Sequence, residues 1–268
     1  MREISAVFLD DGGVMNDNAI RSAEWQRLVG EFFVPVLGGD HEGWAAANRV
    51  VFEHLLDSLT LGPLGRDYTQ WWDEYQSLWL RDMAAFIGVA TPGDDMECTR
   101  LAEEAALYIT QRVRSAYPGV VDTVRIIQEM GKDLFTASGE VSHELDGYLT
   151  GMGIRGCFQT LYGPDLINQA KDGPEYYDRL FKHANVDPKS ALVVDDNFHA
   201  VDWAHSVGAM TCLITVSAPG NIQADITVQS LADLPVTLKE YESNQVALEN
   251  KVNGHPSRLL RHRRNAYR

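Results

Sequence analysis

The hydrophobic and polar positions divide the chain into stretches of different texture. Residues 4–9 (ISAVFL) form a short apolar run closed by Asp-Asp-Gly-Gly, which is typical of a buried strand. From about residue 18 to 115 the apolar positions recur with helical spacing and strand signals are few. Examples are AEWQRLVGEFF, EGWAAANRVVFEHLL, DYTQWWDEYQSLWLRDM and ECTRLAEEAALYITQRVRS. We therefore predict an all-helical insertion after the first strand.

After Pro118-Gly119 the pattern alternates between strands and helices. Four segments read as helices, VVDTVRIIQEMG, SHELDGYLTGMG, PEYYDRLFKHAN and FHAVDWAHSVG. Four read as strands, KDLFTAS, CFQTLYG, ALVVDD and AMTCLIT. Because strands that alternate with helices favour a parallel sheet, we predict an α/β fold with a doubly wound parallel sheet and an inserted helical domain.

The predicted domains follow these changes of pattern. Residues 1–15 and 116–238 would form the Rossmann-like core, and residues 16–115 the helical cap. Residues 239–268 would form a C-terminal helix and a basic tail. The last eighteen residues, KVNGHPSRLLRHRRNAYR, contain six Lys or Arg and no acid. We favour a solvated end that packs on the acidic body over a nucleic-acid arm, because six charges support only weak, salt-sensitive binding.

Composition narrows the class of protein. The 268 residues are 45% hydrophobic, which is enough for a sizeable core, and the formal net charge of -15 disfavours nucleic acid as a main partner. Cys98, Cys157 and Cys212 lack metal or disulfide spacing, as expected for reduced thiols in the cytoplasm. The sequence shows neither a signal segment nor a long apolar span, so we predict a soluble cytoplasmic protein without a membrane partner. Its oligomeric state is open.

Polar groups follow the predicted strands or lie in nearby loops: Asp10, Ser138, Lys171, Asp195 and Asp196. In an open parallel sheet such groups converge at the carboxyl edge, where ligands bind. Carboxylates from two strands can hold Mg²⁺, which prefers oxygen ligands. A further carboxylate can act as a nucleophile, while a lysine and a hydroxyl neutralise and orient the anion that is attacked.

These segments resemble the motifs of the haloacid dehalogenase (HAD) superfamily. FLDDGGV resembles its first motif and LFTAS its second, while Lys171 with the downstream Pro174 resembles the third. ALVVDDN followed by AHSVGAM resembles the fourth. Their order and spacing match across about residues 4–216, and the insertion after the first motif is similar to the helical C1 cap of this superfamily.

The resemblance implies roles for individual residues. Asp10 would be the nucleophile and a ligand of Mg²⁺, and the Gly12 carbonyl would be a second ligand. Asp196, together with Asp195, would complete the protein's share of the metal shell. Ser138, Gly139 and Lys171 would bind the transferred phosphoryl group of a small phosphorylated substrate. Taken alone, Ser138 could instead cap the following helix, and a single lysine is usually a surface residue.

The first motif departs from the family pattern at Gly12. The family's second aspartate, a general acid/base, would stand there, and its loss typically costs ~10²–10⁴-fold in rate. Asp11 is a poor substitute, because adjacent residues of a strand point to opposite faces. Asp17 could reach the site from the linker to the cap.

Three functions stay open at this point. The first is a Mg²⁺-dependent phosphatase with reduced or substrate-assisted catalysis, and the second is a HAD-fold binding or regulatory protein. The third is a metal-free C–halogen hydrolase, which would leave Asp195 and Asp196 facing Asp10 without a cation. Phosphonoacetaldehyde hydrolases also have a small residue at the position of Gly12. They use a cap lysine, however, and residues 14–131 contain none.

Further polar and aromatic residues have a simpler interpretation. We expect His199 and Asp202, on the helix after the fourth motif, to be structural or to face the cap. Five of the six tryptophans lie in the predicted cap: Trp25, Trp44, Trp71, Trp72 and Trp79. We expect them to form the core between the cap helices rather than a substrate box.

Overall fold

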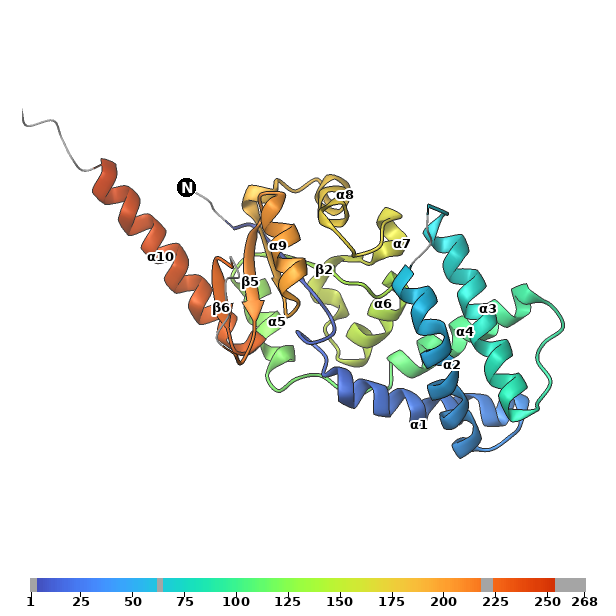
Figure 1. Cartoon of the computed structure of the whole chain (residues 1–268). Coiled ribbons are helices and arrows are strands. Elements are labelled where there is room, and N and C mark those ends of the chain that lie inside the picture. Colours follow the sequence, from blue (N-terminus) through green and yellow to red (C-terminus); the bar gives the residue numbers. More distant parts are fainter. Residues whose placement is uncertain (1–3, 62–64, 218–223, 254–268) are drawn as a thin grey trace, which may run out of the picture.

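The computed structural model describes residues 4–61, 65–217 and 224–253, and it contains a six-stranded parallel sheet (Figure 1). The strand order is β3-β2-β1-β4-β5-β6. The strands are β1 (Ala6–Leu9), β2 (Asp133–Ala137), β3 (Phe158–Tyr162), β4 (Ala191–Asp195), β5 (Met210–Ile214) and β6 (Ile226–Val228). The predicted α/β fold is confirmed, and the short edge strand β6 adds to the predicted set.

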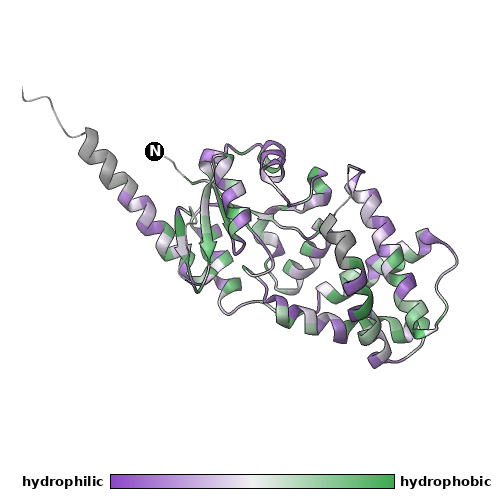
Figure 2. Ribbon diagram, viewed as in Figure 1, coloured by the Kyte–Doolittle hydropathy of each residue, from purple (hydrophilic) through white to green (hydrophobic). Residues whose placement is uncertain are grey.

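Helices cover both faces of this sheet. They are α5 (Val120–Glu129), α6 (Ser142–Gly151), α7 (Pro164–Ile167), α8 (Pro174–Ala184), α9 (Phe198–Ser206) and α10 (Leu234–Asn253). Along β1, Val7 and Leu9 pack in one core cluster with residues of α5 and α6, whereas Phe8 packs in another with α8 and α9. Because both faces are covered, most residues of the strands are apolar and buried, and the strands appear mostly green in Figure 2.

The insertion after β1 is helical, as predicted. It contains α1 (Asn18–Leu37), α2 (His41–Leu61), α3 (Tyr68–Ile87) and α4 (Asp95–Thr110), which we call the cap helices. They share their own apolar core, centred on residues such as Trp44 and Leu80. The last helix ends at Thr110, before the end of the helical pattern in the sequence, and an irregular segment leads back toward the sheet.

The two chain connections between sheet and cap helices run side by side. An isolated antiparallel bridge joins Asn16 to Ala116, and the Asp17 N–H donates to the Ser115 carbonyl over 2.8 Å. The Ser115 hydroxyl also donates to the Asn16 side chain over 2.7 Å. The insertion therefore leaves and re-enters the core at one place.

The C-terminal helix α10 begins at Leu234, earlier than the predicted start at Lys239. Leu234 and Leu238 are buried in the sheet core, so the first turns of this helix belong to the packed body. The predicted basic tail beyond residue 253 lies outside the described residues. None of the helices within the described ranges is both long and apolar enough to span a bilayer.

Candidate functional site

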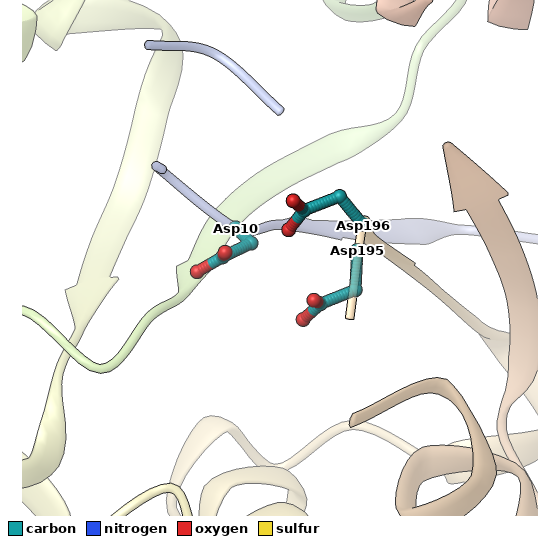
Figure 3. Close-up of side chains that lie close together, drawn as sticks. All are labelled: Asp10, Asp195 and Asp196. Atoms are coloured by element: carbon teal, nitrogen blue, oxygen red, sulfur yellow. The ribbon is translucent and has the colours of Figure 1, made fainter. Parts of the chain in front are cut away.

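The chain reverses its direction of winding between β1 and β4, which are neighbours in the sheet. Such a switch point opens a crevice at the carboxyl ends of the strands. Asp10 follows β1, and Asp195 and Asp196 stand at the end of β4 (Figure 3). One oxygen from each of the three carboxyls lies within 4.8 Å of the others. The predicted convergence of these residues is therefore present in the fold.

Lys171, in the loop between α7 and α8, joins this group. Its Nζ lies 3.0 Å from Asp10 Oδ1 and 2.7 Å from Asp195 Oδ2. Burial favours the neutral amine, but the two carboxylates outweigh that effect and raise the pKa of Lys171 well above its usual range. The lysine thus stands as a buried ammonium ion against the carboxyls of Asp10 and Asp195.

Gly13 explains how the first and fourth motifs come so close. Its φ is +80°, and a Cβ at this position would lie 2.1 Å from Asp196 Oδ2. Only glycine permits both this conformation and this approach. Burial, followed by the nearby Asp10, raises the pKa of Asp196. Three crowded carboxyls beside one ammonium form a hard-oxygen donor set that fits a divalent cation such as Mg²⁺.

Ser138 and Gly139 line the same cavity as Asp10. Ser138 is buried, its N–H donates to the Tyr162 carbonyl over 3.1 Å, and its hydroxyl accepts from the Glu140 N–H over 3.2 Å. It does not cap the next helix, because α6 begins only at Ser142. The hydroxyl instead shapes the loop that follows β2.

The space beside Gly12 is filled by two residues of the first cap helix. A Cβ at Gly12 would lie 2.5 Å from Asn18 Oδ1 and 3.0 Å from Arg21 Nη2. These two side chains hydrogen-bond each other over 2.8 Å and both line the cavity. An amide and a guanidinium therefore occupy the direction in which the family's acid/base side chain would point. The sequence analysis singled out neither residue. The one feature of the sequence that could have pointed to them is their position shortly after the first motif.

Asp11 and Asp17 are engaged elsewhere. Asp11 is fully buried and accepts from Asn16 Nδ2 over 2.7 Å and from Arg21 Nη1 over 2.6 Å. Burial raises its pKa to about 6, while Arg21 opposes that shift. Asp17 caps α1 by accepting two backbone N–H groups of its first turn. Asp11 is therefore unsuitable as a substitute acid/base, and Asp17 holds a helix end instead of reaching the site.

Arg21 links the cap helices to the loops that follow β1 and β2. Its Nη2 lies 3.1 Å from Glu140 Oε1, and its guanidinium lies 5.5 Å from the centre of the Tyr148 ring. Glu144, one helical turn further on and buried, also lines the cavity. Burial, and then the charge of Glu140 and its hydrogen bond, raise the pKa of Glu144 well above its usual range. Sequence reasoning singled out neither glutamate.

A cavity of about 1030 Å³ extends from Asp10 to the cap helices. Its cap side includes Trp25, Asn48, Trp72, Gln76 and Trp79. Trp44, Trp71 and Trp79 are buried in apolar clusters, and Trp25 and Trp72 pack against such clusters, as expected. Trp25, Trp72 and Trp79 border the cavity as well, and helical spacing alone could not show which apolar face does so.

His199 and Asp202 lie on the exposed side of α9. The His199 ring packs against Phe198 and Trp203, with ring centres 3.9 and 6.0 Å apart. Neither His199 nor Asp202 borders the cavity that contains Asp10, so a surface role fits both.

The sheet is doubly wound, carries a helical insertion after β1 and has an Asp–Lys–Asp site at its switch point. Together these features define a class of α/β hydrolases that use an aspartate. The family model described as haloacid dehalogenase-like hydrolase matches residues 18–208, so the chain belongs to this family. The predicted resemblance and the prediction of a hydrolase are confirmed. The match begins after Asp10, whose place in the site comes from the geometry above.

Several curated proteins are similar to part of the chain. Pyrophosphatase PpaX of Listeria welshimeri is 22% identical over 131 residues, which cover 47% of this chain and 60% of that protein. Hexitol phosphatase B of Escherichia coli is 23% identical over 133 residues, with 48% and 60% covered. Phosphoglycolate phosphatase 1 of Pseudomonas aeruginosa is 27% identical over 99 residues, with 37% and 36% covered. The chain thus spans about 60% or less of these relatives.

Solved structures agree over most of the chain. The defluorinating L-2-haloacid dehalogenase Rha0230 has a TM-score of 0.63 at 18% identity, with 88% of this chain and 95% of that chain covered. A HAD phosphatase from Thermococcus onnurineus has a TM-score of 0.56 at 20% identity, with 88% and 98% covered. At this identity the likeness establishes the fold alone.

Proposed function

We propose that this chain is a Mg²⁺-dependent phosphatase that acts on a small phosphorylated metabolite through an aspartyl-phosphate at Asp10. The observation that carries the proposal is the convergence of three carboxyls, Asp10, Asp195 and Asp196, on one place beside Lys171. A metal-free hydrolase would leave this negative charge largely uncompensated. The curated relatives are named as phosphatases and a pyrophosphatase, which supports phosphoryl transfer.

Each residue of the proposed site has a defined task. Asp10, the Gly12 carbonyl and Asp196, with Asp195 beside them, would hold the metal. When bound, Mg²⁺ would offset the carboxylate charge and orient the phosphoryl oxygens. The Asp10 oxygen that faces the cavity would attack phosphorus, while Lys171 and Ser138 would neutralise and position the transferred group, with Gly139 close by.

The cap helices would serve as a lid. We propose that residues 16–115 form this domain and the residues around it the core, and that the lid excludes water from Asp10 during the reaction. The cavity is bordered by α1, α2 and α3 as well as by the catalytic loops, which supports this role. A substrate with a sizeable organic part fits its volume better than a bare phosphate. A cytoplasmic location stays a prediction, supported by three unpaired cysteines.

A second candidate is a binding or regulatory protein that keeps the site but lacks turnover. The observation that favours it is the filled space beside Gly12, where the family's acid/base carboxylate would stand. Such a protein would bind a phosphorylated ligand with Mg²⁺ and release it unchanged.

Beryllofluoride, a mimic of the phosphoryl group on aspartate, tests the proposed covalent step. We expect it to bind the wild-type chain in the presence of Mg²⁺, observed by ¹⁹F NMR, and not to bind Asp10→Ala. A turnover screen of phosphorylated metabolites with and without Mg²⁺ then separates the two candidates. Beryllofluoride binding without turnover of any compound favours the binding protein, and Mg²⁺-independent turnover refutes the proposed metal.

A further inference from the structure

The site contains a carboxyl group, Glu140, that none of the roles above uses. It lies two residues after Ser138, in the loop between β2 and α6, and it lines the cavity together with Asp10. We propose that Glu140 is the general acid/base of this chain and replaces the carboxylate that is missing at Gly12. This inference rests on the proposed phosphatase function.

Position is the first support for this assignment. The direction of the missing side chain is marked by the ideal Cβ of Gly12, which lies 3.0 Å from Arg21 Nη2. The same nitrogen lies 3.1 Å from Glu140 Oε1. One guanidinium nitrogen therefore lies within 3.1 Å of both the Glu140 carboxyl and the point where the missing side chain would begin. The Glu140 side chain keeps 30% exposure, so one part of it remains open to the cavity.

Charge is the second support. Asp11 and Glu140 both pair with the guanidinium of Arg21, and Glu144, which is buried and lines the same cavity, lies beside Glu140. Burial, followed by the charge of Glu140, raises the pKa of Glu144 well above its usual range. Glu144 can therefore keep a proton beside Glu140 and the cavity, where the donor step needs one.

The two proposed steps balance in atoms and charge. In the first, an Asp10 oxygen forms a bond to phosphorus, the bond to the leaving oxygen breaks, and Glu140 donates its proton to that oxygen. In the second, water attacks the phosphorus, its proton passes to Glu140, and the bond to Asp10 breaks. The products are an alcohol and inorganic phosphate, and both carboxyls return to their initial states.

Several charged and titratable groups lie around the Glu140 carboxyl. The charged and titratable groups that face it are Asp11 from the loop after β1, Arg21 from α1, Tyr68 and Tyr75 from α3, and His143, Glu144 and Tyr148 from α6.

The test compares Glu140→Gln with wild type on substrates of different leaving groups. The amide oxygen can still accept from Arg21, so the fold is retained, but proton transfer is lost. With an alkyl phosphate such as glycerol phosphate, or the best alkyl substrate of the metabolite screen, we expect kcat/KM to fall by ~10²–10⁴-fold. Phosphorylation of Asp10 by acetyl phosphate, whose leaving group needs no proton, should stay within about threefold of wild type. Decay of the aspartyl-phosphate should slow by as much as alkyl turnover.

Glu175→Gln is the matched control, because Glu175 also pairs with an arginine, Arg179, but on the exposed side of α8. It should leave both activities unchanged. Glu140→Asp should recover part of the alkyl activity, and Glu140→Gln should flatten the pH dependence of aspartyl-phosphate decay. Equal losses with acetyl phosphate and alkyl phosphate, or unaltered decay in Glu140→Gln, overturn the assignment. Failure of wild type to phosphorylate Asp10 overturns the phosphatase proposal itself, a different outcome.

Discussion

Gly12 and Gly13 are adjacent, yet their missing side chains meet different neighbours. At Gly13 a Cβ would run into Asp196, one of the three carboxyls of the proposed metal site. At Gly12 it would meet the flexible ends of Asn18 and Arg21. The first glycine of this pair therefore leaves the proposed acid/base position without a carboxylate, and the second permits the close approach of the loops after β1 and β4.

Gly13→Ala should damage both stability and metal binding. The positive φ costs ~1–2 kcal/mol for any residue with a Cβ, and here the Cβ must also displace Asp196. Gly88→Ala is the matched control, since Gly88 has φ +82° and open space around it. We expect both variants to lose stability in urea titrations and only Gly13→Ala to lose Mg²⁺ affinity by calorimetry. Equal Mg²⁺ affinities would contradict the proposed role of Asp196.

Gly12→Asp should restore little activity by itself. Glu140 would already supply the acid/base, and Asn18 must rotate away from the new side chain. In a Glu140→Gln background, Gly12→Asp combined with Asn18→Ala removes the contact and should recover part of the ~10²–10⁴-fold loss for alkyl phosphates, and less for nitrophenyl phosphate. Thermal melting checks that each variant folds. A folded, Mg²⁺-binding combined variant without any gain would indicate that the Glu140→Gln defect is not the loss of an acid/base.

At the scale of elements, helix α1 is anchored to the core through Arg21. We expect Arg21→Met to lower the free energy of unfolding by ~3–5 kcal/mol, because Asp11 would remain buried without its cation. Arg27→Met serves as the control, since Arg27 pairs with Glu24 and is half exposed, and such pairs contribute ~0–1 kcal/mol. Asp11→Asn added to Arg21→Met should return part of the loss; no return would show that the cost lies in packing.

The first turn of α6 should make stability depend on pH. The folded chain raises the pKa of Glu144 well above its usual value of 4.5, chiefly by burial. The folded state therefore binds more protons than the unfolded state above about pH 4.5, and stability falls as the pH rises through the folded pKa. Glu144→Gln does not lose stability in this way. The melting temperature of the variant minus that of the wild type should therefore increase from pH 4.5 to pH 8. A constant difference would indicate that Glu144 titrates normally.

At the scale of the whole molecule, we expect the net charge of -15 and the three clustered carboxyls to make the proposed metal binding and the stability of the fold interdependent. Without Mg²⁺, Asp196→Asn should melt above wild type, because it relieves repulsion from Asp10. With Mg²⁺ at 100 times its Kd the wild type should gain ~2.7 kcal/mol and the variant less. NaCl at equal ionic strength controls for screening. If Asp196→Asn melts above the wild type both with and without Mg²⁺, the proposed metal site is contradicted.

Much of this protein follows from its sequence. Apolar runs that alternate with amphipathic helices fixed the parallel sheet, because each pattern reports local backbone structure and burial. Asp10, Ser138, Lys171 and the Asp195-Asp196 pair could be placed together from the sequence, since the carboxyl ends of parallel strands and the loops beside them share one edge. The short β6 and α7 escaped prediction because three or four residues carry too little periodicity.

Only the tertiary structure decided what surrounds these groups. Through Arg21, the loop after β1 and helix α1 meet Glu140, which lies far along the chain, and the filling of the space beside Gly12 depends on how α1 leaves the sheet. Likewise, helical spacing grouped the cap tryptophans on apolar faces but could not divide them between core and cavity. Local patterns determine which elements form, whereas the neighbours of a side chain depend on the packing of elements against each other.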